Sequence, residues 1–116
     1  MPVNPLPNYE TVPLRSDNIK VAVAQTTYRS IDANNAKQGI RKNLDHMMTF
    51  VDYVEMRHQR DLVIFHEFPL QGSDIRWTRD EQMKVAIEVP GEETEIIGQK
   101  AKQHNCYIEF GSRALL

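Results

Sequence analysis

The chain has 116 residues, a length that suits one domain. It contains 14 Lys and Arg residues against 16 Asp and Glu residues, and a formal net charge of −2 gives no reason to expect a nucleic acid or a membrane as partner. No apolar stretch approaches the roughly 18–20 residues that a bilayer-spanning helix needs. The single cysteine, Cys106, excludes an intrachain disulfide, and we therefore expect a cytoplasmic protein.

Residues 1–18 are predicted to form an extended N-terminal arm. Four prolines fall within the first thirteen residues, where they disfavour helix and remove backbone donors. The same residues lack the basic start and apolar core of a secretory signal. We therefore expect the folded domain to span residues 19–116.

The first strand and the first helix are predicted from their apolar patterns. At residues 19–25, Ile19, Val21 and Val23 alternate with a lysine and small alanines, which leave both faces able to be covered, as in a buried sheet. At residues 35–58, apolar side chains recur at steps of three and four, which predicts an amphipathic helix. The members of this apolar stripe are Ile40, Leu44, Met47, Met48, Val51 and Val54.

The second half of the chain continues the alternation. Four consecutive apolar residues within 61–66 predict a central strand that is buried on both faces. Helices are predicted at 78–87 and at 92–103, the second with acidic residues at its start and lysines near its end, as the helix dipole favours. A last strand is predicted at 106–111. The expected order is β-α-β-α-α-β, which indicates an α/β fold.

Glu67 is the candidate functional residue, because it follows the apolar strand directly. Open α/β sheets place their ligand sites at the carboxyl edge of the strands. A carboxylate that is partly desolvated at this edge becomes a better base. A glutamate at a strand end can also simply reach solvent or pair with an arginine, and the pattern alone leaves both interpretations open.

Other residues near Glu67 give weaker signals. His66 precedes it, but neighbouring strand residues point to opposite faces and make a poor pair of metal ligands, so we predict no metal site. Arg76 and Trp77 in the following loop could line a pocket or form an ordinary surface pair. The glycine-rich loops GxGxxG and GxxxxGK[ST], which bind phosphates, are absent from the sequence.

Three segments together resemble the nitrilase superfamily of carbon–nitrogen hydrolases. The first strand is similar to the family's opening strand, IKVAVAQ. The second strand and its loop resemble the strand–glutamate–loop segment, DLVIFHEFPLQG. The remainder resembles the proline–glycine turn, helix and third strand, VPGEETEIIGQKAKQHNCYIEFGSR. The resemblance covers residues 19–113 and implies the N-terminal part of an α-β-β-α sandwich.

The resemblance also implies an activity, the hydrolysis of non-peptide carbon–nitrogen bonds by a glutamate, a lysine and a cysteine. Glu67 stands at the place of the catalytic glutamate, and His66 stands where many members carry proline. The family's lysine and cysteine follow the third strand, so neither Lys102 nor Cys106 matches them. We therefore expect this chain to be inactive alone. A small amide or nitrile substrate, a homo-oligomer and the lack of any metal or organic cofactor are implied as well.

The unmatched residues have plain interpretations. Cys106 is expected to be a small buried hydrophobic residue, and Lys84, Lys100 and Lys102 to be solvated helix charges. The resemblance also implies that one face and an edge of the sheet stay uncovered in this chain, because the intact family fold packs two sheets between helix layers, and we therefore expect the chain alone to be poorly stable. The competing interpretation is a small flavodoxin-like βαβ module that binds a ligand or a partner without catalysis.

Overall fold

The computed structural model describes residues 16–115, so most of the predicted N-terminal arm lies outside the described residues. Its elements in chain order are β1 (Val21–Ala24), the 3-10 helix η1 (Ala33–Asn35), α1 (Ala36–Arg57), β2 (Leu62–Phe65), α2 (Arg79–Val85), β3 (Ile87–Glu88), α3 (Glu92–His104), β4 (Tyr107–Glu109) and β5 (Ala114–Leu115). The chain is a mixed α/β protein. The expected order β-α-β-α-α-β differs from the observed one, because the short strand β3 lies between α2 and α3 and the short strand β5 follows β4.

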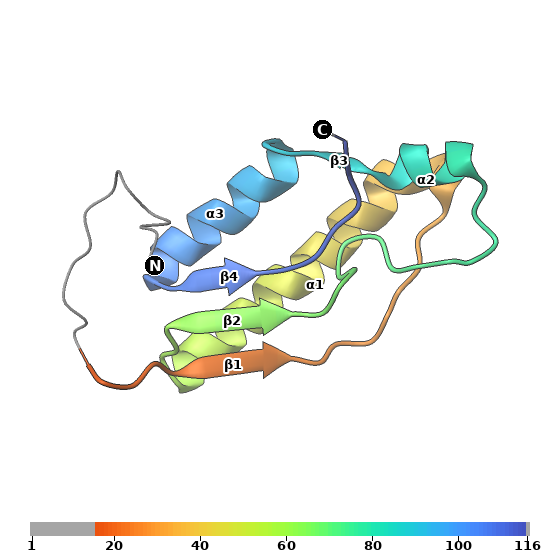
Figure 1. Cartoon of the computed structure of the whole chain (residues 1–116). Coiled ribbons are helices and arrows are strands. Elements are labelled where there is room, and N and C mark those ends of the chain that lie inside the picture. Colours follow the sequence, from red (N-terminus) through yellow and green to blue (C-terminus); the bar gives the residue numbers. More distant parts are fainter. Residues whose placement is uncertain (1–15, 116) are drawn as a thin grey trace, which may run out of the picture.

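The main sheet has three parallel strands in the order β1-β2-β4 (Figure 1). Strand β2 lies in the middle, as the apolar run at 62–65 predicts. The register pairs Val21 with Leu62 and Leu62 with Tyr107. Because all three strands run in one direction, the residues that follow them meet at one carboxyl edge.

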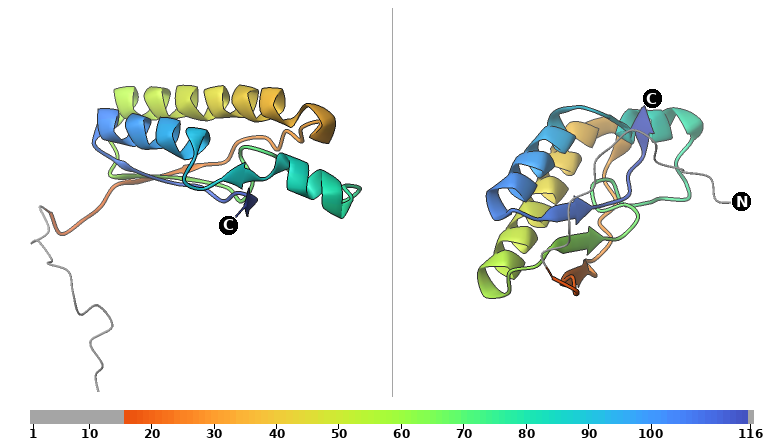
Figure 2. Two further views of the ribbon diagram at one scale, coloured as in Figure 1. Left: turned by 90° about the horizontal axis from the view of Figure 1, so that it is seen from above. Right: turned by 60° about the vertical axis from the view of Figure 1, so that its left-hand side comes forward.

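Helices α1 and α3 lie side by side on one face of this sheet (Figure 2). The predicted apolar stripe of α1 faces the core: five of its six members are buried, and Val54 is partly buried. From the sheet, Ala24, Val63 and Phe65 pack against these helices. Burial of this stripe is the main stabilising contribution to the fold, at roughly 1.5–3 kcal/mol for each large apolar side chain.

The opposite face of the sheet is open. Side chains alternate between the two faces of a strand, so Val21, Val23 and Tyr107 share the face turned away from the helices. Their exposed fractions are 41%, 74% and 79%. Leu62 and Ile64 of β2 are also only partly buried. The prediction that β2 is buried on both faces is therefore wrong for the described residues, and the prediction of one uncovered face is confirmed.

Helix α2 is shorter than predicted. Thr78 caps it, since its hydroxyl accepts from the amide of Glu81 at 3.2 Å while the Glu81 carboxylate accepts from the amide of Thr78 at 3.1 Å. The helix ends at Val85, so Ile87, which was predicted to be helical, lies in β3 instead. Val89, the residue before Pro90, is restricted to extended conformations. The β-branched side chains of Ile87 and Val89 favour the same conformations. Strand β3 pairs in parallel with β5.

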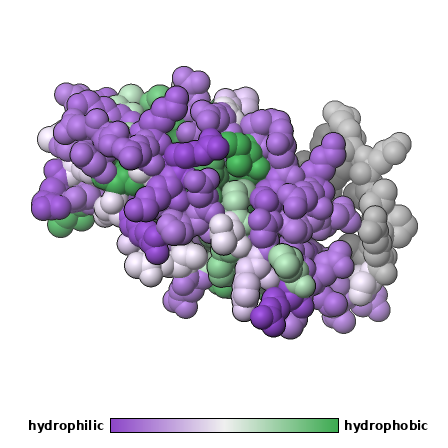
Figure 3. All heavy atoms as spheres, turned by 180° about the vertical axis from the view of Figure 1, so that it is seen from behind, coloured by the Kyte–Doolittle hydropathy of each residue, from purple (hydrophilic) through white to green (hydrophobic). Residues whose placement is uncertain are grey.

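The helix layer presents a largely hydrophilic outer face (Figure 3). Arg41, Lys42 and Asp45 of α1 are among its exposed residues. Within residues 16–115, no helix combines the length and the apolar composition that crossing a membrane requires. The exposed apolar side chains of the sheet, Val21, Val23 and Tyr107, lie on the opposite face of the molecule from this hydrophilic helix layer.

Candidate functional site

Glu67 lies two residues beyond the end of β2, at the carboxyl edge of the central strand. This is the place that the sequence predicts for it. Its side chain is exposed, and within residues 16–115 its carboxylate has no hydrogen-bond or ion-pair partner. Of the two interpretations that the sequence leaves open, the described residues therefore show a glutamate that reaches solvent at the edge of the sheet, and not a partly desolvated carboxylate.

The backbone of Glu67 is fixed on the β4 side by Gly111. The Gly111 amide donates to the carbonyl oxygen of His66 at 3.3 Å. A Cβ atom on Gly111 would stand 2.2 Å from the carbonyl oxygen of Glu67. Only glycine allows this close approach of the two chain segments.

On the β1 side, the contact is made by the side chain of His66. Its Nε2 lies 2.7 Å from Oγ1 of Thr26, and its ring centroid lies 4.5 Å from that of Tyr28. The other ring nitrogen, Nδ1, is buried and has no hydrogen-bond partner within residues 16–115. Burial lowers the pKa of His66, so the ring is neutral at neutral pH.

Two buried amide side chains hold the loop that follows Glu67. Nδ2 of Asn43 donates to the carbonyl of Leu70 at 2.8 Å and to that of Arg29 at 3.0 Å. Nε2 of Gln71 donates to Val85 O at 3.2 Å and, at 3.0 Å each, to Ser112 Oγ and Arg113 O. Sequence reasoning missed both residues. A signal existed for Asn43, which occupies a position of the apolar stripe between Ile40 and Leu44.

An arginine stacks on the aromatic side chains of the same loop. The Arg113 guanidinium lies 4.8 Å from the ring centroid of Phe68 and 5.8 Å from that of Trp77. Trp77 is buried, whereas Arg76 is exposed and pairs with Asp74 at 2.9 Å. The Arg76 guanidinium lowers the pKa of Asp74 to about 2. The two residues therefore differ in burial, but both line one open pocket, which is one of the two interpretations that the sequence left open.

Cys106 lies at the opposite end of the sheet from Glu67. The register of β2 against β4 places it level with Asp61, and the six residues from there to Glu67 span about 20 Å of strand. Burial, and then the charge of Glu55, raise the pKa of the Cys106 thiol. Because a raised pKa disfavours the reactive thiolate, the half-buried cysteine fits the predicted packing role better than a nucleophilic one.

The helix residues Lys84, Lys100 and Lys102 also make their contacts away from Glu67. Lys84 is exposed and donates to Oδ1 of Asn34 at 3.2 Å, and Lys102 is exposed. Lys100 differs from the prediction, because it is partly buried and its Nζ lies 2.9 Å from Oδ1 of Asp52. It joins α3 to α1 and is not a freely solvated charge.

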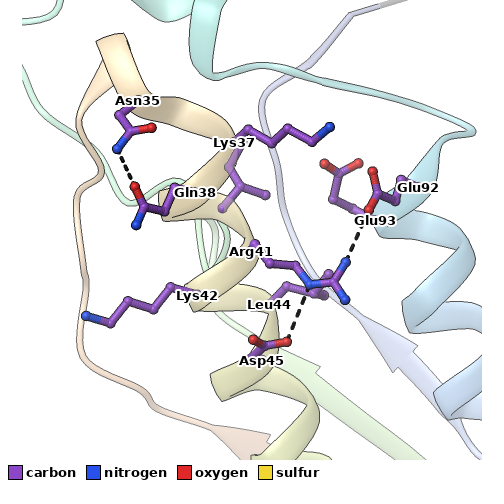
Figure 4. A pocket seen from close by; sticks show the side chains of 10 residues that line it. Asn35, Lys37, Gln38, Arg41, Lys42, Leu44, Asp45, Glu92 and Glu93 are labelled. Atoms are coloured by element: carbon purple, nitrogen blue, oxygen red, sulfur yellow. Dashed lines mark hydrogen bonds and ion pairs between the residues drawn. The ribbon is translucent and has the colours of Figure 1, made fainter.

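A groove of about 580 Å³ lies between the N-terminal parts of α1 and α3 (Figure 4). Ile40 and Leu44 form its apolar floor. Arg41 crosses it to Glu92 at 3.1 Å and also approaches Asp45 at 3.7 Å. These charges are paired with one another and exposed, and Glu67 does not line the groove. The groove therefore gives no support to the chemistry expected at the edge of the sheet.

Within the described part of the chain, no three His, Cys, Asp or Glu side chains are grouped so that they could hold a metal ion. A scan of the chain against models of known protein families finds no match. The functional interpretation therefore rests on the position of Glu67 and on the contacts that fix its backbone.

Proposed function

We propose that the chain is the N-terminal part of a nitrilase-superfamily hydrolase of carbon–nitrogen bonds, with Glu67 as its general base. The position of Glu67 at the carboxyl end of the central parallel strand is the observation that supports this proposal most directly. The contacts of Gly111 and His66 fix its backbone from both neighbouring strands. A general base needs such a fixed position to meet the proton that it accepts.

The arrangement of layers supports the same proposal. Both long helices cover one face of the sheet, and the other face presents Val21, Val23 and Tyr107 to solvent. In an α-β-β-α sandwich, a second sheet packs on this face. The uncovered apolar face of the described residues has the composition that such packing needs.

In the proposed reaction, the Glu67 carboxylate accepts the proton of a cysteine thiol, and the thiolate attacks the carbon of a small amide or nitrile. A lysine stabilises the negative charge that develops. The amine or ammonia leaves, and water activated by Glu67 releases the acid from the thioester. The cysteine and the lysine have to come from other sequence, because Cys106 and Lys100 lie elsewhere. A homo-oligomer in the cytoplasm, with no metal or organic cofactor, belongs to the same proposal.

The competing proposal is a βαβ module without catalysis. A flavodoxin-like sheet has the strand order 2-1-3-4-5 with helices on both faces. Here β2, and not β1, lies in the middle, and both long helices cover one face. The observed order matches one half of a dinucleotide-binding sheet, but the glycine-rich phosphate loop is missing. The described topology therefore favours the hydrolase proposal over the flavodoxin-like one.

Assays of ammonia release from a panel of short amides and nitriles test the proposal. The 116-residue chain is expected to be inactive, and a polypeptide extended by the coding sequence after Leu116 is expected to be active. Glu67→Gln is expected to abolish that activity, whereas Glu95→Gln, at an exposed glutamate of helix α3, preserves it. An active extended Glu67→Gln protein would exclude Glu67 as the base. Ammonia release by the 116-residue chain would show that no further lysine or cysteine is needed.

A further inference from the structure

The end of β2 is attached to its two neighbours in different ways. On the β4 side, the backbone of Gly111 supplies both the hydrogen bond to His66 O and the close contact with Glu67 O. On the β1 side, the backbone ladder runs to the end of β2, where Phe65 pairs with Ala24. Beyond this pair, the connection is the side-chain bond of 2.7 Å between His66 and Thr26.

The surroundings of the ring indicate which nitrogen holds the proton. Nδ1 is buried without a partner in the described part of the chain. A buried N–H without an acceptor costs more than a buried lone pair, because orphaned N–H groups are the rarer case in proteins. The neutral ring therefore has its proton on Nε2, which donates to Oγ1 of Thr26. The lowered pKa of His66, caused by burial, agrees with a neutral ring.

We propose that His66 is a positioning residue for Glu67: its Nε2–H bond to Thr26 holds the segment directly after β2 against the segment after β1, while Gly111 holds it on the β4 side. The ring contact with Tyr28 fixes the orientation of the imidazole. This assignment rests on the proposed function, because positioning matters only where Glu67 reacts. The position of the glutamate is then a property of three neighbouring segments and not of β2 alone.

Amide hydrogen exchange and histidine nitrogen spectra of the isotope-labelled 116-residue chain test the assignment. In the wild type, we expect the proton of His66 on Nε2. Thr26→Val removes the hydroxyl that the His66 ring bonds. The Gly111 amide is then expected to exchange about fivefold faster, because the loss of one net hydrogen bond changes an opening equilibrium by about this factor. The Glu67 amide resonance is expected to shift as well. Thr26→Ser keeps the hydroxyl and is expected to preserve both wild-type values.

The Tyr107 amide is the internal control, because it donates to Asp61 O at 2.8 Å at the other end of the same pair of strands. His66→Phe, which keeps a ring against Tyr28, is expected to match Thr26→Val. Unchanged exchange at Gly111, or an equal increase at Tyr107, in both variants would overturn the assignment. This measurement does not depend on the hydrolase assay. If the assay fails but Thr26→Val still speeds exchange at Gly111, only the proposed function is rejected.

Discussion

Gly111 lies against the backbone of Glu67 so closely that a Cβ atom at position 111 would stand 2.2 Å from the Glu67 carbonyl oxygen. Real Cβ atoms do not approach an oxygen this closely, and the nearest atoms belong to backbone that cannot rotate away. The segment after β4 therefore needs glycine at this position. The place of the candidate base is determined partly by a residue 44 positions later in the chain.

Gly111→Ala is predicted to lower the free energy of unfolding by about 1–3 kcal/mol, the usual cost of overpacking. The new methyl group has to push β4 away from the end of β2. Urea unfolding followed by circular dichroism measures the loss. Gly98→Ala is the matched control, since no atom lies within 4 Å of its added Cβ in α3. It is expected to gain about 0.5–1 kcal/mol, and equal effects of the two changes would contradict the prediction.

Gln71 is predicted to be a larger source of stability than any exposed polar residue. Gln71→Met removes the amide that bonds the carbonyls of Val85 and Arg113, and buried acceptors without a partner cost free energy. We expect a loss of about 2–3 kcal/mol in urea unfolding. The same substitution at Gln99, an exposed residue of α3, is expected to stay within about 0.5 kcal/mol. A loss at Gln71 no larger than that at Gln99 would refute this role.

The long elements of the fold could be predicted from sequence because their signals are local. The 3.6-residue apolar stripe defines α1 to within one residue at each end, and the apolar run at 62–65 defines β2. Strands β3 and β5 could not be predicted, since each has two residues and exists only through pairing between Ile87 and Ala114. Burial on both faces was wrong for β2 because an apolar run does not reveal how many layers cover it.

The candidate site was also predictable only in part, because only some of its residues have local signals in the sequence. Glu67 is visible in the sequence because it follows an apolar strand directly. The residues that hold its surroundings act over long sequence separations: Gln71 bonds Arg113, and His66 bonds Thr26. Periodicity and turn chemistry contain no information about such pairs. Among these residues, only Asn43 has a local signal in the sequence, because it is a polar residue within an apolar stripe.

The open face of the sheet is predicted to make the 116-residue chain self-associate. Val23→Lys places a charge on this face and is expected to shift the chain toward monomer in sedimentation velocity runs. Met56→Lys is the control, because Met56 of α1 is even more exposed, at 82%, but lies on the helix layer. It is expected to leave association unchanged. A wild-type chain that is monomeric and melts sharply and cooperatively would contradict the prediction.

Asp52 is predicted to make stability depend on pH. His104 Nε2 lies 2.7 Å and Lys100 Nζ 2.9 Å from its carboxylate, so α3 is attached to α1 by both residues. The hydrogen bond from His104, followed by the bond and charge of Lys100, holds the pKa of Asp52 below its ordinary value of 3.8, against an opposing effect of burial. A depressed carboxyl pKa stabilises the folded state above pH 3.8, and this contribution is lost as the pH falls through the lower, folded value.

Asp52→Asn is therefore expected to flatten the acid limb of the stability curve. Unfolding free energies measured from about pH 5 down to about pH 2 should fall less steeply for the variant than for the wild type. At neutral pH the variant is expected to lose only about 0.5–1 kcal/mol, because the carboxylate is partly exposed and screened. Asp45→Asn, at an exposed position of the same helix, is the control and should preserve the wild-type slope. Parallel curves for the wild type and Asp52→Asn would show that this cluster does not link the folding of α1 and α3 to proton binding.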